Sequence, residues 1–225
     1  MFKEFLTALL HKIITFLVSH KDLFEHSESE REKILEKLSV PEAFRTYLTK
    51  VSAPKFMKDI ETVVLYLEDP KNTNITGNEF FKRFLEFLSK DLARKIDYMD
   101  TDYFLMRKEK RIEFIEKLIK GDSILASSLR GILVNHSYQQ ITEQVYALGN
   151  KTEKTPYIVV QSPREMDTEL KKEIRSHLTK VWPLSLPTFQ INRRLIGGLR
   201  VFVDGKTTDN SWLSRVLRYT SLTAN

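Results

Sequence analysis

The chain has 225 residues, of which 41% are hydrophobic and 29% charged, and it contains no cysteine. This apolar content can supply one or two buried cores, whereas the lack of cysteine excludes a disulfide framework, a thiolate nucleophile and a cysteine-ligated zinc site. The net charge of +6 lies entirely in residues 151–225, where thirteen Lys and Arg stand against seven Asp and Glu, so this third could meet nucleic acid, an anionic membrane surface or an acidic partner.

The first twenty residues, MFKEFLTALLHKIITFLVSH, form an apolar stretch interrupted by charges. Their hydrophobic residues recur at i, i+3, i+4 and i+7, which predicts an amphipathic helix. Lys3, Glu4 and Lys12 break the run, so the pattern is neither that of a signal peptide nor that of a membrane-spanning helix. The apolar face either packs into a core or lies in a bilayer interface. We assign residues 1–40 as an N-terminal helical extension.

Residues 41–150 show one helical pattern after another and predict a helical bundle. The extension before them contains a helix capped by Ser27 or Ser29 and ending near Ser39. Within the bundle, Thr76 or Asn78 is the expected cap of the helix that carries an aromatic stripe. This stripe, which we expect in the core, consists of Phe80, Phe81, Phe84, Leu85, Phe87 and Leu88. Residues 100–121 read as one further helix, with Gly121 as its end cap, and one or two more helices reach Asn150.

The hydrophobic pattern of the sequence changes after Lys151. Residues 156–163 predict a strand, residues 164–182 a helix, and residues 186–192 and 199–205 two more extended segments. The helix should bury a stripe made of Met166, Leu170, Ile174 and Leu178. A last helix, capped by Asp209 or Asn210, follows. We therefore predict an α+β protein: an all-α bundle followed by a small α/β domain with a short sheet over residues 155–225.

Two glycine-containing segments flank the last predicted strand. Gly197 and Gly198 precede it and allow either positive φ or a close approach of two backbones. Asp204 and Gly205 follow it and predict a hairpin turn or strand exit. The chain contains neither GxGxxG between a strand and a helix nor GxxxxGK[ST], so we interpret these glycines as structural rather than phosphate-binding.

The order of these elements and motifs in residues 157–219 resembles the C-terminal portion of the delta subunit of F-type ATP synthase, called OSCP in mitochondria. Ser162 matches the serine that ends the family's first strand, with Pro163 in place of alanine. The Ile-Gly-Gly motif and the Asp-Gly-Ser motif correspond to Leu195, Ile196, Gly197, Gly198, Asp209, Asn210 and Ser211, with asparagine in place of the second motif's glycine.

Two positions depart from the family pattern. Asn192, Arg193 and Arg194 stand where the family usually has an aspartate before its glycine motif. Upstream, Asn135 matches the first residue of the family's Asn-x-Arg motif, but the arginine has no counterpart.

The resemblance implies a non-catalytic stator adaptor with no cofactor and no bound metal. Its partners would be N-terminal segments of the alpha subunits in the catalytic head and the b subunit of the peripheral stalk, held through helix-in-groove contacts; no homo-oligomer and no nucleic acid are expected. Such a protein belongs to a peripheral membrane complex on the cytoplasmic, matrix or stromal side. The expected stalk contacts are Arg193, Arg194, Arg200, Trp212, Leu213, Val216 and Leu217, and the expected structural motif is Gly197, Gly198, Asp204, Gly205, Asp209, Asn210 and Ser211.

Other functions are compatible with parts of the sequence. Similar glycine patterns occur in the E-like stalk subunit of V/A-type ATPases and in an export-apparatus regulator, and the basic third also suits a nucleic-acid-binding or membrane-surface scaffold protein. An enzyme is disfavoured because the five histidines lack metal-ligand spacing and no serine lies in GxSxG. The acidic residues Asp97, Asp100 and Asp102 lack the pattern of a calcium loop, so we interpret them as a solvated loop or a helix cap.

Overall fold

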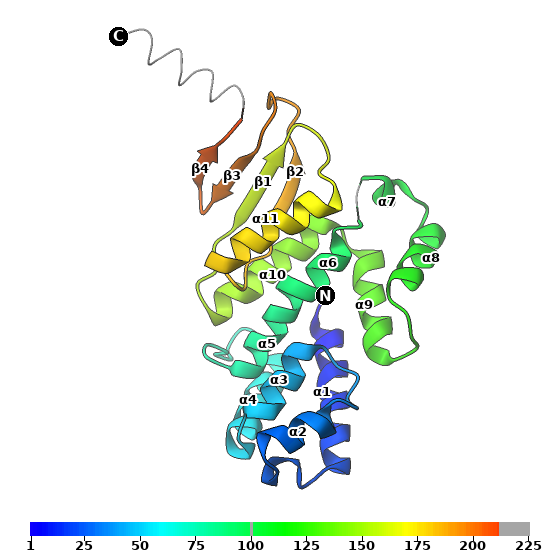
Figure 1. Ribbon diagram of the computed structural model, residues 1–225, viewed down its shortest axis with the longest axis vertical. Coiled ribbons are helices and arrows are strands. Elements are labelled where there is room, and N and C mark those ends of the chain that lie inside the picture. The colour runs from blue at the N-terminus through cyan, green and yellow to red at the C-terminus, as the bar shows by residue number, and fades with distance from the viewer. Residues whose placement is uncertain (100, 212–225) are drawn as a thin grey trace.

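The computed structural model describes residues 1–99 and 101–211, and it shows a helical part followed by a four-stranded sheet (Figure 1). The predicted α+β class is confirmed. The helices before the sheet are α1 (Lys3–Ser19), α2 (Glu28–Leu35), α3 (Glu42–Lys50), α4 (Ala53–Glu68), α5 (Glu79–Phe87), α6 (Ala93–Ile96), α7 (Thr101–Leu105), α8 (Lys108–Leu118), α9 (Ile124–Asn135) and α10 (Tyr138–Thr152). A single π turn, Leu88–Leu92, joins α5 to α6.

Side-chain caps fix several helix starts. Ser27 caps α2 in a reciprocal capping box with Glu30, and Asn78 caps α5 by accepting a hydrogen bond from the Phe81 amide. The sequence allowed Ser27 or Ser29 as the cap of α2 and Thr76 or Asn78 as the cap of α5. In each pair, one residue is the cap: Ser27 and Asn78. Helix α2 ends earlier than predicted because the chain turns after it to bury Leu38 and Val40.

The segment predicted as one helix over residues 100–121 contains two helices, α7 and α8. The break falls at Arg107, whose extended backbone (ψ 152°) directs α8 away from α7. Tyr103 is buried on α7 and its hydroxyl donates to the Leu133 carbonyl of α9 (3.0 Å). The short helix is therefore held by a tertiary contact that a periodicity argument does not contain.

Helix α1 lies within the bundle and its apolar face is core. Phe5 stacks on Phe84 and Phe87 of the predicted aromatic stripe, with ring centroids 6.1 and 5.2 Å apart. Leu9 and Ile13 are fully buried in the same core. This burial favours the core interpretation of the first helix over the bilayer interpretation. None of the helices in residues 1–99 and 101–211 combines the length and the apolar character needed to cross a membrane.

The sheet has the strand order β2-β1-β3-β4 and lies on α11 (Thr168–Val181). Its strands are β1 (Ile158–Ser162), β2 (Thr188–Ile191), β3 (Arg200–Val203) and β4 (Lys206–Asp209). β1 runs parallel to β2 and antiparallel to β3, and β3 forms a hairpin with β4. The predicted stripe packs on the strands, but of its four members only Met166, which precedes α11, is buried, and Leu170, Ile174 and Leu178 are partly buried. The buried residues of α11 itself are Lys171 and Arg175.

Strand β4 was not predicted, and the last predicted helix lies outside the described residues. β4 reads KTTD and is mostly exposed, so it has no apolar alternation to reveal it; pairing with β3 makes it a strand. Trp212, Leu213, Val216 and Leu217 also lie outside the residues that the structure describes.

Candidate functional site

The family motifs found in the sequence meet at one end of the sheet. Ser162 ends β1, Ile191 ends β2, Arg200 begins β3 and Asp209 ends β4. Because of the strand directions, these four positions and the Gly197–Gly198 loop share one end, at the top of Figure 1, which we call the motif end. Residues from 162 to 211 are thus brought together by topology.

Gly198 permits a close contact within the motif end. Its φ is +72°, and a Cβ atom built on it would lie 2.5 Å from the carbonyl oxygen of Asn210 and 2.9 Å from the Cα of Ser211. The Asn210 amide donates to the Leu199 carbonyl (3.0 Å). Both reasons for expecting a glycine hold at this position, because the backbone is left-handed and a second segment passes directly over it.

Asp209 is held by charge-assisted hydrogen bonds. The Arg200 Nη2 and Nε atoms donate to its Oδ2 at 2.6 and 3.0 Å, and the Ser211 amide donates to its Oδ1 at 2.9 Å. Hydrogen bonds from Ser211, and then those from Arg200, lower the pKa of Asp209 to about 2. The charge of Arg200 is therefore already paired within the β3–β4 hairpin.

This pairing predicts a pH dependence. Since the folded pKa of Asp209 lies below its unfolded value of about 3.9, its contribution to stability is present above pH ~4 and is lost as pH falls toward 2. Asp209→Asn should therefore flatten the acid limb of the stability profile between pH ~4 and 2. Urea denaturation at several pH values measures this. An identical slope in both proteins would contradict the assignment.

The turn at the opposite end of the sheet also follows the sequence. Asp204 and Gly205 both have positive φ, +47° and +81°, which is the geometry of a tight hairpin turn. The Asp204 carboxylate accepts from the Tyr157 amide (2.8 Å) and fastens the turn to the start of β1. Of the two outcomes that the DG dipeptide allowed, a hairpin turn or a strand exit, the structure has the hairpin turn.

Arg193 and Arg194 are exposed in the loop that leaves β2. Two large apolar side chains on either side of them, Ile191 and Ile196, are 46% and 56% exposed. Arg164, after β1, is exposed at the same end. The motif end thus presents a basic surface with apolar side chains among the charges, which suits an acidic partner with apolar anchors.

A family model described as ATP synthase delta (OSCP) subunit matches residues 101–222, more than half of the chain. The chain belongs to this family. No curated protein matches it. A delta (OSCP) subunit is a non-catalytic part of the peripheral stalk in a peripheral membrane complex, and the match favours it over the E-like and export-regulator alternatives. The matched region contains the whole motif end and α7–α11.

The delta (OSCP) region takes part in a second feature, a joint that fixes the sheet to the bundle, together with residues that precede the match. Arg175 on α11 makes a two-pronged hydrogen-bonded ion pair with Asp97, which follows α6; one of the two distances, Nη2–Oδ1, is 2.6 Å. Their side chains are 6% and 1% exposed. Of the two interpretations of Asp97, the solvated loop is wrong, because its carboxylate is the buried partner of an arginine 78 residues away, whereas the residue does stand at the C-cap of α6.

Polar and aromatic contacts surround this ion pair. The Tyr138 hydroxyl donates to the Pro187 carbonyl (2.7 Å), and the Thr188 hydroxyl bonds that of Thr142 (2.9 Å). The Arg175 guanidinium lies 5.6 Å from the centre of the Phe189 ring. Burial raises the pKa of the Tyr138 phenol, which stays neutral. We call these residues, with Asp97, the joint; sequence reasoning missed it.

The joint extends into the bundle core. Leu184 and Leu186, between α11 and β2, belong to the same buried apolar cluster as α1, α3, α5 and α9. The Ser89 hydroxyl of the π turn donates to the Pro183 carbonyl (3.2 Å). The linker before β2 is thus anchored in the helical part. Within residues 1–99 and 101–211, no three His, Asp or Glu side chains are grouped as metal ligands.

Proposed function

We propose that this subunit is a stiff adaptor that joins the catalytic head of a rotary ATP synthase to its peripheral stalk. The observation that carries the proposal is the position of the motif end: it lies at the opposite end of the long axis from α1–α4, with the joint between them (Figure 1). A stator must resist torque from the rotor, so a two-ended protein needs a fixed connection between its ends. The family match supports this role.

The stalk would bind at the motif end. Arg193 and Arg194 have no ion-pair partner among residues 1–99 and 101–211, so they offer positive charge to an acidic stalk segment, while Ile191 and Ile196 offer apolar contact area. Arg200 would act indirectly, by holding Asp209 and the hairpin. We also keep Trp212, Leu213, Val216 and Leu217, outside the described residues, as proposed stalk contacts.

The catalytic head would bind at the end of the molecule formed by α1–α4, which we call the bundle end. Helices α1 and α4 contact each other, and between them they expose Ile14, Val18, Met57, Val64 and Leu65. An amphipathic helix from a head subunit could cover these side chains, with burial contributing about 25 cal/mol per Å². The family model begins at residue 101, so this contact rests on the exposed apolar surface rather than on the match. Mass spectrometry of proteins captured from native membranes tests both partners.

Charge reversal tests the stalk assignment. Arg193→Glu with Arg194→Glu is expected to weaken binding of a peptide from the end of the cognate stalk subunit by about tenfold or more, mostly at low salt. The matched control is Lys180→Glu with Lys206→Glu, which makes the same charge change at the other end of the sheet. Calorimetry measures affinity and circular dichroism checks the fold. Equal losses in the two double variants would count against the motif end as the stalk site.

A further inference from the structure

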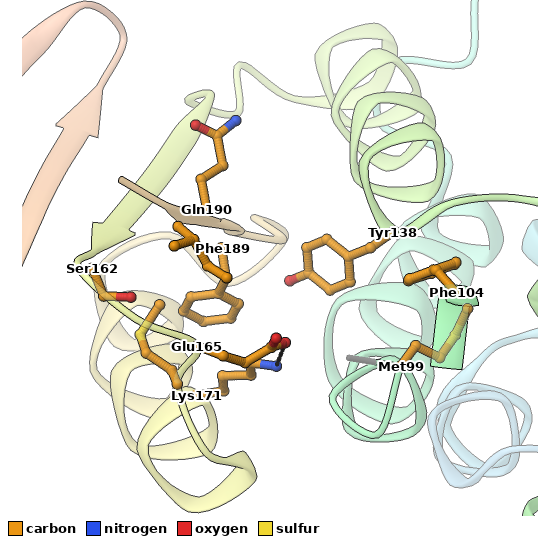
Figure 2. A pocket seen from close by; sticks show the side chains of 10 residues that line it. Met99, Phe104, Tyr138, Ser162, Glu165, Lys171, Phe189 and Gln190 are labelled. Carbon is orange, nitrogen blue, oxygen red and sulfur yellow. Dashed lines mark ion pairs between the residues drawn. The ribbon is translucent and has the colours of Figure 1, made fainter. Parts of the chain in front are cut away.

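A cavity of about 250 Å³ lies between the helical part and the sheet (Figure 2). Its walls come from both sides. Met99, Phe104 and Tyr138 belong to the helical part, whereas Met166, Lys171 and Phe189 belong to the sheet part; Ser162, Glu165, Gln190 and Ile191 complete the lining. The cavity is therefore mainly apolar, with few polar groups, as small-molecule sites generally are.

Lys171 is the unusual member of this lining. The residue is 6% exposed, and its ammonium group lies beside the Glu165 carboxylate (Figure 2). Its one charged partner among the described residues is Glu165, whose Oε1 lies 3.8 Å from Nζ, too far for a hydrogen bond. Within residues 1–99 and 101–211, Nζ makes no hydrogen bond. Nζ is not among the enclosed, unpartnered side-chain atoms of the described residues, so it opens onto the pocket and its three donors are available to a ligand.

The chemistry of the cavity selects a class of ligand. One buried cation with free donors favours a single carboxylate, since Arg175, the other nearby cation, is already paired with Asp97. The aromatic and methionine walls favour an apolar body. A cavity of about 150 Å³ can hold benzene, so this larger space admits one ring or a branched chain with a short acid arm.

We propose that this cavity is a binding site for a small monocarboxylate with one aromatic or branched aliphatic group. The carboxylate accepts hydrogen bonds from Lys171, and the apolar body lies against Phe189, Met99 and Phe104, since the Tyr138 and Phe189 rings already contact each other. Because the walls come from both parts of the chain, the bound acid bridges the bundle and the sheet next to the joint. This site is independent of the stalk role and stands or falls separately.

Substitution of Glu165 tests the proposal, because the direction in which the affinity for a carboxylate changes can be predicted. The Glu165 side chain is 38% exposed, and it lies against the ammonium that the ligand needs. Its negative charge therefore opposes an incoming carboxylate. Glu165→Gln should therefore strengthen binding of an acid. Binding of a neutral ligand should stay unchanged or weaken.

The probe pair is 3-phenylpropionate and its neutral amide, 3-phenylpropanamide, titrated into the full chain by NMR or calorimetry. The wild-type protein is expected to bind the acid about tenfold or more tightly than the amide, as one charge-assisted contact provides. Lys171→Met should abolish this preference while amide binding persists. Lys172→Met, the neighbouring exposed lysine, should keep it. Glu165→Gln should raise the affinity for the acid by about three- to tenfold.

Binding of the acid and the amide with equal affinity, or no binding of the acid at millimolar concentration, would overturn the proposal. So would an acid preference that survives Lys171→Met. If that variant does not fold, the acid-to-amide ratio of the wild-type protein and the sign of the Glu165→Gln effect still decide, since neither needs a change at Lys171.

Discussion

Asp97→Ala is expected to lower the free energy of unfolding by about 3–5 kcal/mol. The change leaves the guanidinium of Arg175, 6% exposed, without its carboxylate partner. Burying an unpaired charge costs far more than the pair itself contributes, because the desolvation of both ions is already compensated by their mutual hydrogen bonds. Urea denaturation followed by circular dichroism measures the loss.

Two further variants separate the buried charge from other effects. Glu169→Ala removes one partner of an exposed pair on the same helix, with Lys172 at 3.4 Å, and should cost about 0–1 kcal/mol. Asp97→Leu with Arg175→Met removes both charges and should recover much of the stability that Asp97→Ala loses. If Asp97→Ala costs no more than Glu169→Ala, the joint does not hold the two parts together.

The sequence predicted elements well where periodicity carries the information. α5 buries its apolar stripe at helical spacing, the stripe of α11 is partly buried against the sheet, and β1 alternates buried and half-buried residues. Prediction from the sequence failed where contacts between distant residues determine the local structure. The helix breaks at Arg107, α7 is held by the buried Tyr103, and β4 has no apolar signal of its own.

The missed strand also explains what the sequence could not say about Arg200. Its partner Asp209 is nine residues away, and the two face each other only because β3 and β4 pair. Because β4 was not predicted, Arg200 was interpreted as an unpaired charge that contacts the stalk. The joint was hidden for a similar reason: Asp97 and Arg175 carry no motif, and only the docking of α11 on the end of α6 brings them together.

The glycine motif, by contrast, was visible because its function is in the backbone. Gly198→Ala is expected to lower the free energy of unfolding by about 3 kcal/mol. Left-handed φ at +72° costs an alanine about 1–2 kcal/mol, and the added Cβ would overlap the Asn210 carbonyl, which is backbone and cannot rotate away. The Asn210–Leu199 hydrogen bond should weaken, so faster hydrogen exchange at the Asn210 amide reports the same displacement.

Gly205→Ala is the matched control, because φ at that position is +81° and a Cβ would meet nothing within 4 Å. It should cost only the conformational part, about 1–2 kcal/mol. The difference between the two variants isolates the contact between the glycine loop and the segment after β4. A contact of this kind cannot be relieved by a rotamer change, so it fixes the loop that carries Arg193 and Arg194 relative to the hairpin. If the two alanine variants cost the same, the motif end lacks the close packing on which a stiff stalk contact depends.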